Sequence, residues 1–229
     1  MTSRTATRRR AMNSGHPRAA SVPRPHAVWF ALAAVVVVAA VIAVVTTHGS
    51  GSSRSATGVE QTRPVQVVGD SLPTLASAKT DPAVGALVPE LHGASFDGTP
   101  VAVARDGTAR LVLFVAHWCP HCRREVPMLA SYLRAHSLPA GVQLVTIATA
   151  TNSNQPNFPP SAWLADESWP APVLADSADS AAAKAFGLPG YPYFVAIDRA
   201  GHVVDRTSGE ISTDEFAALA QEAATGTAE

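Results

Sequence analysis

Residues 114–127 read FVAHWCPHCRREVP and contain both cysteines of the chain, Cys119 and Cys122. The run 110–116 (RLVLFVA) is apolar and β-prone after its first residue, which predicts a strand buried on both faces. The segment 120–135 carries apolar residues at helical spacing, which predicts a helix. A buried strand that leads through two cysteines into a helix places both sulfurs at the helix start, where they become the first candidates for function.

The residue types between the cysteines indicate redox chemistry. Pro120 is favoured at the first helical position, so Cys119 is expected to be the N-cap. A thiolate at an N-cap faces free backbone N–H groups and the positive end of the helix dipole, which stabilise its charge. His121 can add charge or a hydrogen bond to the same sulfur, and Cys122, one turn on, suits the role of resolving thiol.

A C-x-x-C pair alone is also compatible with metal binding. The alternative function is a copper or zinc carrier that uses both cysteines with His117 or His121. The chain has no second cysteine pair to complete a zinc site, and covalent haem attachment would require histidine where Arg123 stands. Redox exchange, which needs no cofactor, is therefore the favoured interpretation.

The remaining pattern predicts an α/β domain over residues 81–229. The strand 142–149 (VQLVTIAT) follows the cysteine helix, and this strand–helix–strand order predicts a parallel pair. Residues 150–172 contain five prolines and are expected to form an insertion. Further expected elements are a strand at 101–104, short helices at 161–167 and 180–186 (the second closed by Gly187), strands at 173–175, 193–197 and 202–206, and a C-terminal helix opened by a capping box from Ser212 to Glu215.

An apolar stretch near the N-terminus predicts a membrane anchor. Residues 27–45 carry no charge, and a helix of this length, at about 1.5 Å per residue, roughly spans a hydrocarbon core of about 30 Å. A cleaved signal peptide is the rival interpretation, but its apolar region is normally shorter. Because the six arginines of the first 26 residues precede the stretch, the N-terminus is expected in the cytoplasm.

This topology divides the chain into four parts. Residues 1–26 are expected to be a disordered cytoplasmic tail, 27–45 the transmembrane anchor, and 46–80 a flexible extracytoplasmic linker that leads to the 81–229 domain. The protein is thus expected to be single-pass in the cell membrane, with its cysteines outside the cytoplasm. A net charge of −1 gives no basic footprint for nucleic acid.

Two stretches together resemble the thioredoxin superfamily, and more narrowly the membrane-anchored TlpA/ResA-like thiol-disulfide oxidoreductases. They are 114–127, quoted above, and 187–201 (GLPGYPYFVAIDRAG), within a domain over about 81–225. The resemblance implies a thioredoxin-like α/β fold with a central mixed β-sheet flanked by helices. It also implies exchange with exported protein thiols or disulfides, or with apocytochromes, and a membrane or soluble redox partner.

The resemblance also implies roles for individual residues. Cys119 would be the attacking nucleophile and Cys122 the resolving cysteine. Tyr191–Pro192 would be a cis peptide beside the disulfide, with the backbone of Tyr191 pairing with an extended substrate, and Trp118 would border the site.

Two departures from the family pattern concern proton transfer and redox direction. Leu113 stands where many thioredoxins have a buried aspartate. Glu125 matches a glutamate of TlpA/ResA-like proteins, and it is either a proton shuttle for Cys122 or a solvated acid in the first turns of the helix. The Pro120–His121 pair resembles strongly oxidising DsbA-type enzymes, whereas the surrounding frame resembles reductases, so these residues do not give the direction.

Overall fold

The computed structural model describes residues 59–76 and 80–227. The expected tail, the expected anchor and residues 46–58 of the expected linker lie outside this part of the chain. Within the described ranges, no helix combines the length and the apolar character needed to cross a membrane.

A five-stranded mixed sheet forms the centre of the domain, in the order β6-β5-β4-β7-β8. β4 pairs in parallel with β5, and β5 in parallel with β6, whereas β7 is antiparallel to both β4 and β8. The bounds of the strands are β4 Ala109–Val115, β5 Val142–Ala148, β6 Val173–Ala175, β7 Tyr193–Ile197 and β8 Val203–Ser208. The parallel pair that the sequence predicts is confirmed, and β7 and β8 form an antiparallel hairpin.

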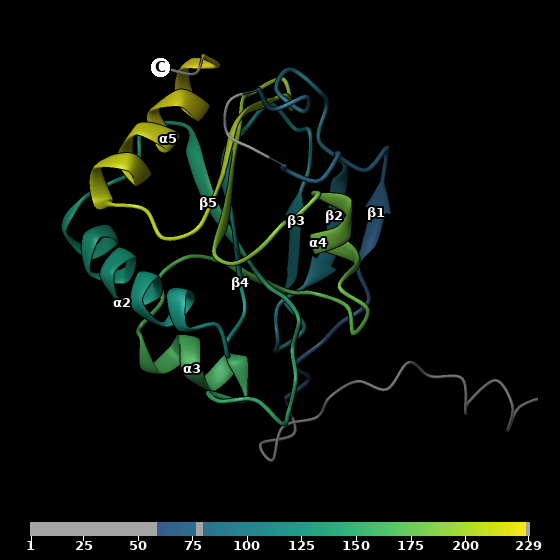
Figure 1. Ribbon diagram of the computed structural model, residues 1–229, viewed down its shortest axis with the longest axis vertical. Coiled ribbons are helices and arrows are strands. Elements are labelled where there is room, and N and C mark those ends of the chain that lie inside the picture. Colours follow the sequence, from purple (N-terminus) through teal and green to yellow (C-terminus); the bar gives the residue numbers. More distant parts are fainter. Residues whose placement is uncertain (1–58, 77–79, 228–229) are drawn as a thin grey trace, which may run out of the picture. The chain divides into compact units, whose positions relative to one another are not determined.

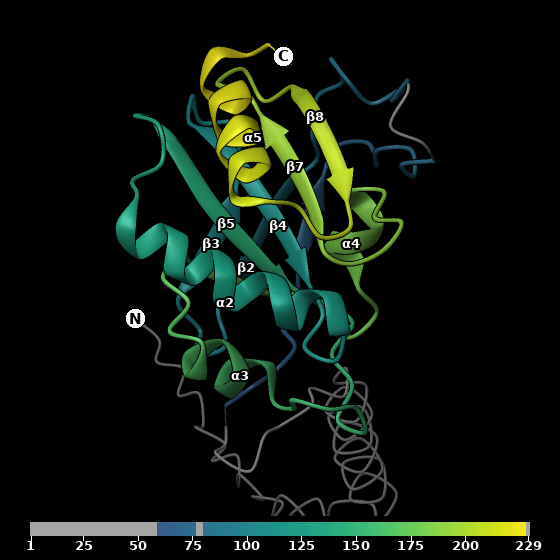
Figure 2. The ribbon, with the colours of Figure 1, turned by 60° about the vertical axis from the view of Figure 1, so that its left-hand side comes forward.

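Helices cover both faces of this sheet. Figure 1 shows α2, α3 and α5 on one side and α4, with a smaller sheet, on the other. Figure 2, turned by 60°, shows α2 running across the front of β4 and β5. The helices are α2 Pro120–Ala135, α3 Pro160–Asp166, α4 Ala181–Ala185 and α5 Thr213–Thr225. A central mixed sheet flanked by helices is the architecture that the sequence predicts.

The side chains of β4 explain why its sequence is apolar without alternation. Leu111, Leu113 and Val115 join a hydrophobic cluster that contains buried residues of α2 and α5. Val112 and Phe114 point to the opposite face and join a second cluster, which contains buried residues of α4. Because successive strand residues face opposite sides, a strand covered on both faces needs apolar residues at every position.

The folded domain begins earlier than the sequence predicts. Three strands form a second, antiparallel sheet in the order β1-β2-β3: β1 Gln66–Val68, β2 Glu90–Ala94 and β3 Pro100–Val103. Leu72 and Leu75 are also buried in the cluster under α4. The prediction of a flexible linker up to residue 80 is therefore wrong for residues 59–76, because isolated apolar residues that cannot form a core of their own can still pack against an existing one.

Two helix ends agree with the sequence analysis. Gly187 follows α4 with φ +64°, and a Cβ at this position would lie 2.3 Å from the carbonyl oxygen of Pro73, so glycine is required there. Ser212 caps α5: its hydroxyl accepts a hydrogen bond from the Glu215 N–H, and the Glu215 carboxylate accepts one from the Ser212 N–H. The capping box is confirmed.

Candidate active site

Cys119 is the N-cap residue of α2, as predicted, and Pro120 occupies the first helical turn. The cysteine lies just beyond the end of β4, where its N–H donates to the carbonyl of Ala116 at 3.0 Å. Its own carbonyl accepts from the Arg123 N–H at 3.1 Å and so begins the helical hydrogen-bond pattern. Cys119 retains 5% of its surface exposed and Cys122 none, and both are free thiols.

The stretch 187–201 also reaches Cys119, through the residues just before β7. The Tyr191–Pro192 peptide bond is cis, and the Cys119 thiol donates to the Tyr191 carbonyl at an S···O distance of 3.6 Å. The Trp118 and Tyr191 rings meet edge to face, with centroids 5.6 Å apart. The fold therefore brings Trp118 and Cys119 to the Tyr191–Pro192 peptide, although Cys119 and Tyr191 are 72 residues apart in the sequence.

The two thiols have different surroundings. Burial raises the pKa of the Cys122 thiol far above its usual range. The charge of Cys119 and the hydrogen bond between the two side chains raise this pKa further, although a backbone hydrogen bond from Ala116 lowers it. Cys122 is therefore held as a neutral thiol in contact with Cys119, which retains the only exposed surface of the pair.

Glu125 lies beneath the site. It is 1% exposed, so the solvated-acid interpretation is wrong. Burial raises the pKa of the Glu125 carboxyl to about 7, the nearby charges of Glu210 and Glu215 raise it as well, and a hydrogen bond from the Ile211 N–H lowers it. Both carboxylate oxygens lie 3.3 Å from that nitrogen. A carboxyl that titrates near neutral pH can both take up and release a proton.

A charged cluster of His121, Arg124 and Glu210 stands in solvent beside the start of α2. The His121 Nδ1 lies 2.5 Å from Glu210 Oε1, and Arg124 Nε donates to both carboxylate oxygens at 3.0 and 3.1 Å. The hydrogen bond from Arg124, and then that from His121, lower the pKa of the Glu210 carboxyl to about 2. Sequence reasoning missed Glu210, because it is 89 residues away from His121 and belongs to no local motif.

His117 is buried, at 1% exposure. Its two ring nitrogens contact the loop 150–157, which we call the loop wall. The described residues contain no group of three or more His, Cys, Asp and Glu side chains arranged to hold a metal ion. The metal-carrier alternative therefore finds no support.

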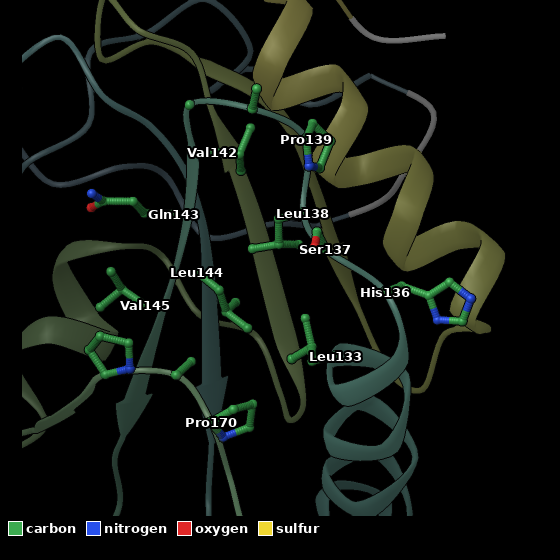
Figure 3. Close-up of a pocket in the computed structure, with 14 residues that line it drawn as sticks. Leu133, His136, Ser137, Leu138, Pro139, Val142, Gln143, Leu144, Val145 and Pro170 are labelled. Atoms are coloured by element: carbon green, nitrogen blue, oxygen red, sulfur yellow. The ribbon is translucent and has the colours of Figure 1, made fainter.

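Two hollows flank the loop wall near the cysteines. One, of about 440 Å³, includes Trp118, and the other, of about 380 Å³, includes Pro120 and Asn157. A larger hollow of about 730 Å³ lies between the end of α2 and the start of β5, where Figure 3 shows Leu133, Leu138 and Leu144. β5 starts opposite the first residue of β4, whereas Cys119 follows the last, so this larger hollow is at the wrong end of the sheet for the cysteine chemistry.

The Redoxin family model matches residues 67–222, which is more than half of the chain. The chain belongs to the Redoxin family. The match begins within β1 and ends within α5. Comparison with curated proteins gives no match.

Solved structures share the fold of this Redoxin family member. StoA from Bacillus subtilis is 22% identical, with a TM-score of 0.50, and the match covers 60% of this chain and 98% of that one. A thiol:disulfide interchange protein of the thioredoxin family from Chlorobium tepidum TLS is 25% identical, with a TM-score of 0.50 over 68% of this chain and 99% of its own. These likenesses confirm a thioredoxin-like fold.

Proposed function

We propose that this Redoxin family member is an extracytoplasmic thiol-disulfide oxidoreductase that works through Cys119 and Cys122. The observation that carries the proposal is the contrast between the two thiols at the start of α2. Cys119 is at the helix N-cap and keeps 5% of its surface exposed, whereas Cys122 has no exposed surface and a raised pKa. The first suits attack on an incoming disulfide and the second suits resolution.

In the reducing direction, the Cys119 thiolate attacks one sulfur of the substrate disulfide. The substrate S–S bond breaks, a mixed disulfide with Cys119 forms, and the released substrate sulfur takes up a proton. Cys122 then loses its proton and attacks the Cys119 sulfur, which releases the second substrate thiol. The substrate gains two electrons, the Cys119–Cys122 pair becomes a disulfide, and the reverse sequence would donate a disulfide.

Glu125 is proposed to take the proton from Cys122 in the second step. Cys122 holds its proton strongly, because burial raises the pKa of its thiol, so its attack requires a base. Glu125 lies one helical turn away, and its pKa of about 7 matches that task at neutral pH. Trp118 and Pro192 are proposed to border the attacking sulfur, and the Tyr191 backbone is proposed to pair with an extended substrate.

The proposed location follows from the apolar stretch 27–45. We propose that it anchors the protein in the cell membrane with residues 1–26 in the cytoplasm and the cysteines outside. The substrates would then be thiols or disulfides of exported proteins, or apocytochromes, and a membrane or soluble redox protein would restore the active form.

The test is reduction of a protein disulfide by the full-length protein with dithiothreitol as reductant. The wild-type chain is expected to catalyse the reaction and Cys119→Ala to abolish it, and Cys122→Ala, mixed with the substrate without dithiothreitol, is expected to accumulate a mixed disulfide. Normal turnover by the Cys119→Ala variant would overturn the assignment. The direction follows from the reduction potential of the pair: a value near about −120 mV would indicate an oxidant and one near about −270 mV a reductant.

A further inference from the structure

His117 uses both ring nitrogens to hold the loop wall. Its Nδ1–H donates to the carbonyl of Pro156 at 2.7 Å, and its Nε2 accepts from the Asn152 N–H at 3.2 Å. One nitrogen must carry a proton and the other a lone pair, so only the neutral imidazole makes both bonds. Burial lowers the pKa of His117, which favours this neutral form.

Two more hydrogen bonds join the loop wall to the residues just before Cys119. The Trp118 indole N–H donates to the Ala150 carbonyl at 2.8 Å, and the Asn157 side-chain amide donates to the His117 carbonyl at 3.0 Å. Ala150 and Asn157 both have left-handed backbones, with φ of 49° and 60°. For alanine this conformation is sterically unfavourable, so the bonds hold the loop in a shape that it would not adopt alone.

This shape produces the hollow of about 440 Å³ beside Trp118. The residues that line it carry no charge: Trp118, Ala150, Thr151, Asn152, Ser153 and Gln155. Their amide and hydroxyl groups can donate and accept hydrogen bonds. A ligand that fits this lining is a polar, uncharged stretch of polypeptide.

The position of the hollow indicates which substrates would reach it. Cys119, Tyr191 and Trp118 are linked by the thiol–carbonyl contact and the ring contact described above. A polypeptide with a sulfur at Cys119 and a backbone along Tyr191 must continue past one of the neighbouring surfaces. The hollow beside Trp118 is one such surface, whereas a small disulfide bound at Cys119 need not extend that far.

We propose that the hollow between Trp118 and the loop wall binds the uncharged polar residues that flank the reacting disulfide of a polypeptide substrate, and that His117 is the positioning residue that keeps this wall in place. The proposal rests on the proposed function of the cysteine pair. It assigns to the insertion 150–172 a role in selecting polypeptide substrates.

The experiment uses single turnovers of the reduced full-length protein. One probe is a peptide with a single cysteine between serine and asparagine residues, joined to thionitrobenzoate as a mixed disulfide. The other is the small disulfide 5,5′-dithiobis(2-nitrobenzoate). For His117→Leu, the half-saturating peptide concentration is expected to rise about tenfold. The limiting rate and the rate of reaction with the small disulfide should change less than twofold, and the reduction potential should stay the same.

Asn157→Gly provides a second variant that avoids a buried cavity. Glycine keeps the left-handed backbone but removes the hydrogen bond to the His117 carbonyl, so a rise of about threefold for the peptide alone is expected. His136→Gln is the matched control, because His136 is exposed at the other end of α2. It should leave both reactions unchanged.

The outcomes separate the two proposals. If the wild-type protein releases thionitrobenzoate from neither probe, the proposed function fails. If it reacts with both, but Asn157→Gly and a folded His117→Leu protein bind the peptide as the wild type does, the assignment of the loop wall fails. Equal half-saturation by a peptide with glutamate or lysine flanks would overturn the preference for uncharged residues.

Discussion

Two regions near Cys119 differ in how they are held: the charged cluster of His121, Arg124 and Glu210 stands in solvent, whereas the loop wall is fixed to buried His117 by uncharged hydrogen bonds. Exposed ion pairs are screened by water and salt and contribute little to stability. A buried donor or acceptor that loses its partner costs much more. We therefore expect the loop wall to fix the geometry of the site and the charged cluster to act mainly through its electric field.

The largest expected effect is on the loop wall. His117→Leu removes the partners of the Asn152 N–H and the Pro156 carbonyl, so the free energy of unfolding should fall by about 3 kcal/mol. Urea unfolding of the full-length protein measures this loss, with His136→Leu as the control at an exposed position. If His117→Leu lost no more free energy of unfolding than the control, the distinction between the loop wall and the charged cluster would not hold.

The second-largest expected effect is a pH dependence of the free energy of unfolding that comes from Glu125, which lies near the charged cluster. Its pKa rises from the usual 4.5 to about 7 in the folded protein. The neutral carboxyl is therefore favoured by folding, and this stabilisation is complete below about pH 4.5 and is lost as pH rises through about 7. Between pH 5 and pH 8 the free energy of unfolding should fall by about 2 kcal/mol from this group.

Glu125→Gln should remove that part of the pH dependence, because the amide oxygen can still accept from the Ile211 N–H but the side chain no longer titrates. His117 acts in the opposite sense, because burial lowers its pKa: the stability that its neutral form contributes is fully present above about pH 6.5 and is lost as pH falls from there toward the lowered pKa. Urea unfolding at pH 5, 6.5 and 8 separates the two. If the free energy of unfolding of Glu125→Gln depended on pH between 5 and 8 as it does in the wild type, Glu125 would not be the titrating group.

The smallest effect on stability is expected at the charged cluster. Glu210→Gln leaves Arg124 and His121 without their carboxylate, but all three side chains are in water, so the urea midpoint should not change measurably. Any change in the rate of disulfide exchange should disappear at about 1 M salt, where screening acts within roughly 3 Å. A drop in the urea midpoint as large as that of His117→Leu would show that the charged cluster stabilises the fold as much as the loop wall does.

Individual elements show which parts of the fold can be predicted from the sequence. The bounds of α2 and β7 are those predicted, because Pro120 marks a helix start and a run of five apolar residues at 193–197 marks a buried strand. β2 was not predicted, since Glu90, His92 and Gly93 interrupt its pattern and only pairing with β1 and β3 makes it a strand. Leu72 and Leu75 were assigned to a linker because their burial also depends on packing against distant parts of the chain.

The sequence by itself determined what depends on neighbouring residues: the cysteine pair at a helix start, the buried strand before it, and the order of strands and helices that follows. Only the tertiary structure decided which distant groups meet at that helix. Glu210 reaches His121, the loop wall reaches His117, and Glu125 becomes buried against Ile211. These contacts depend on loop paths and on burial, which local propensity does not encode, and burial is what changes the pKa of Cys122 and Glu125.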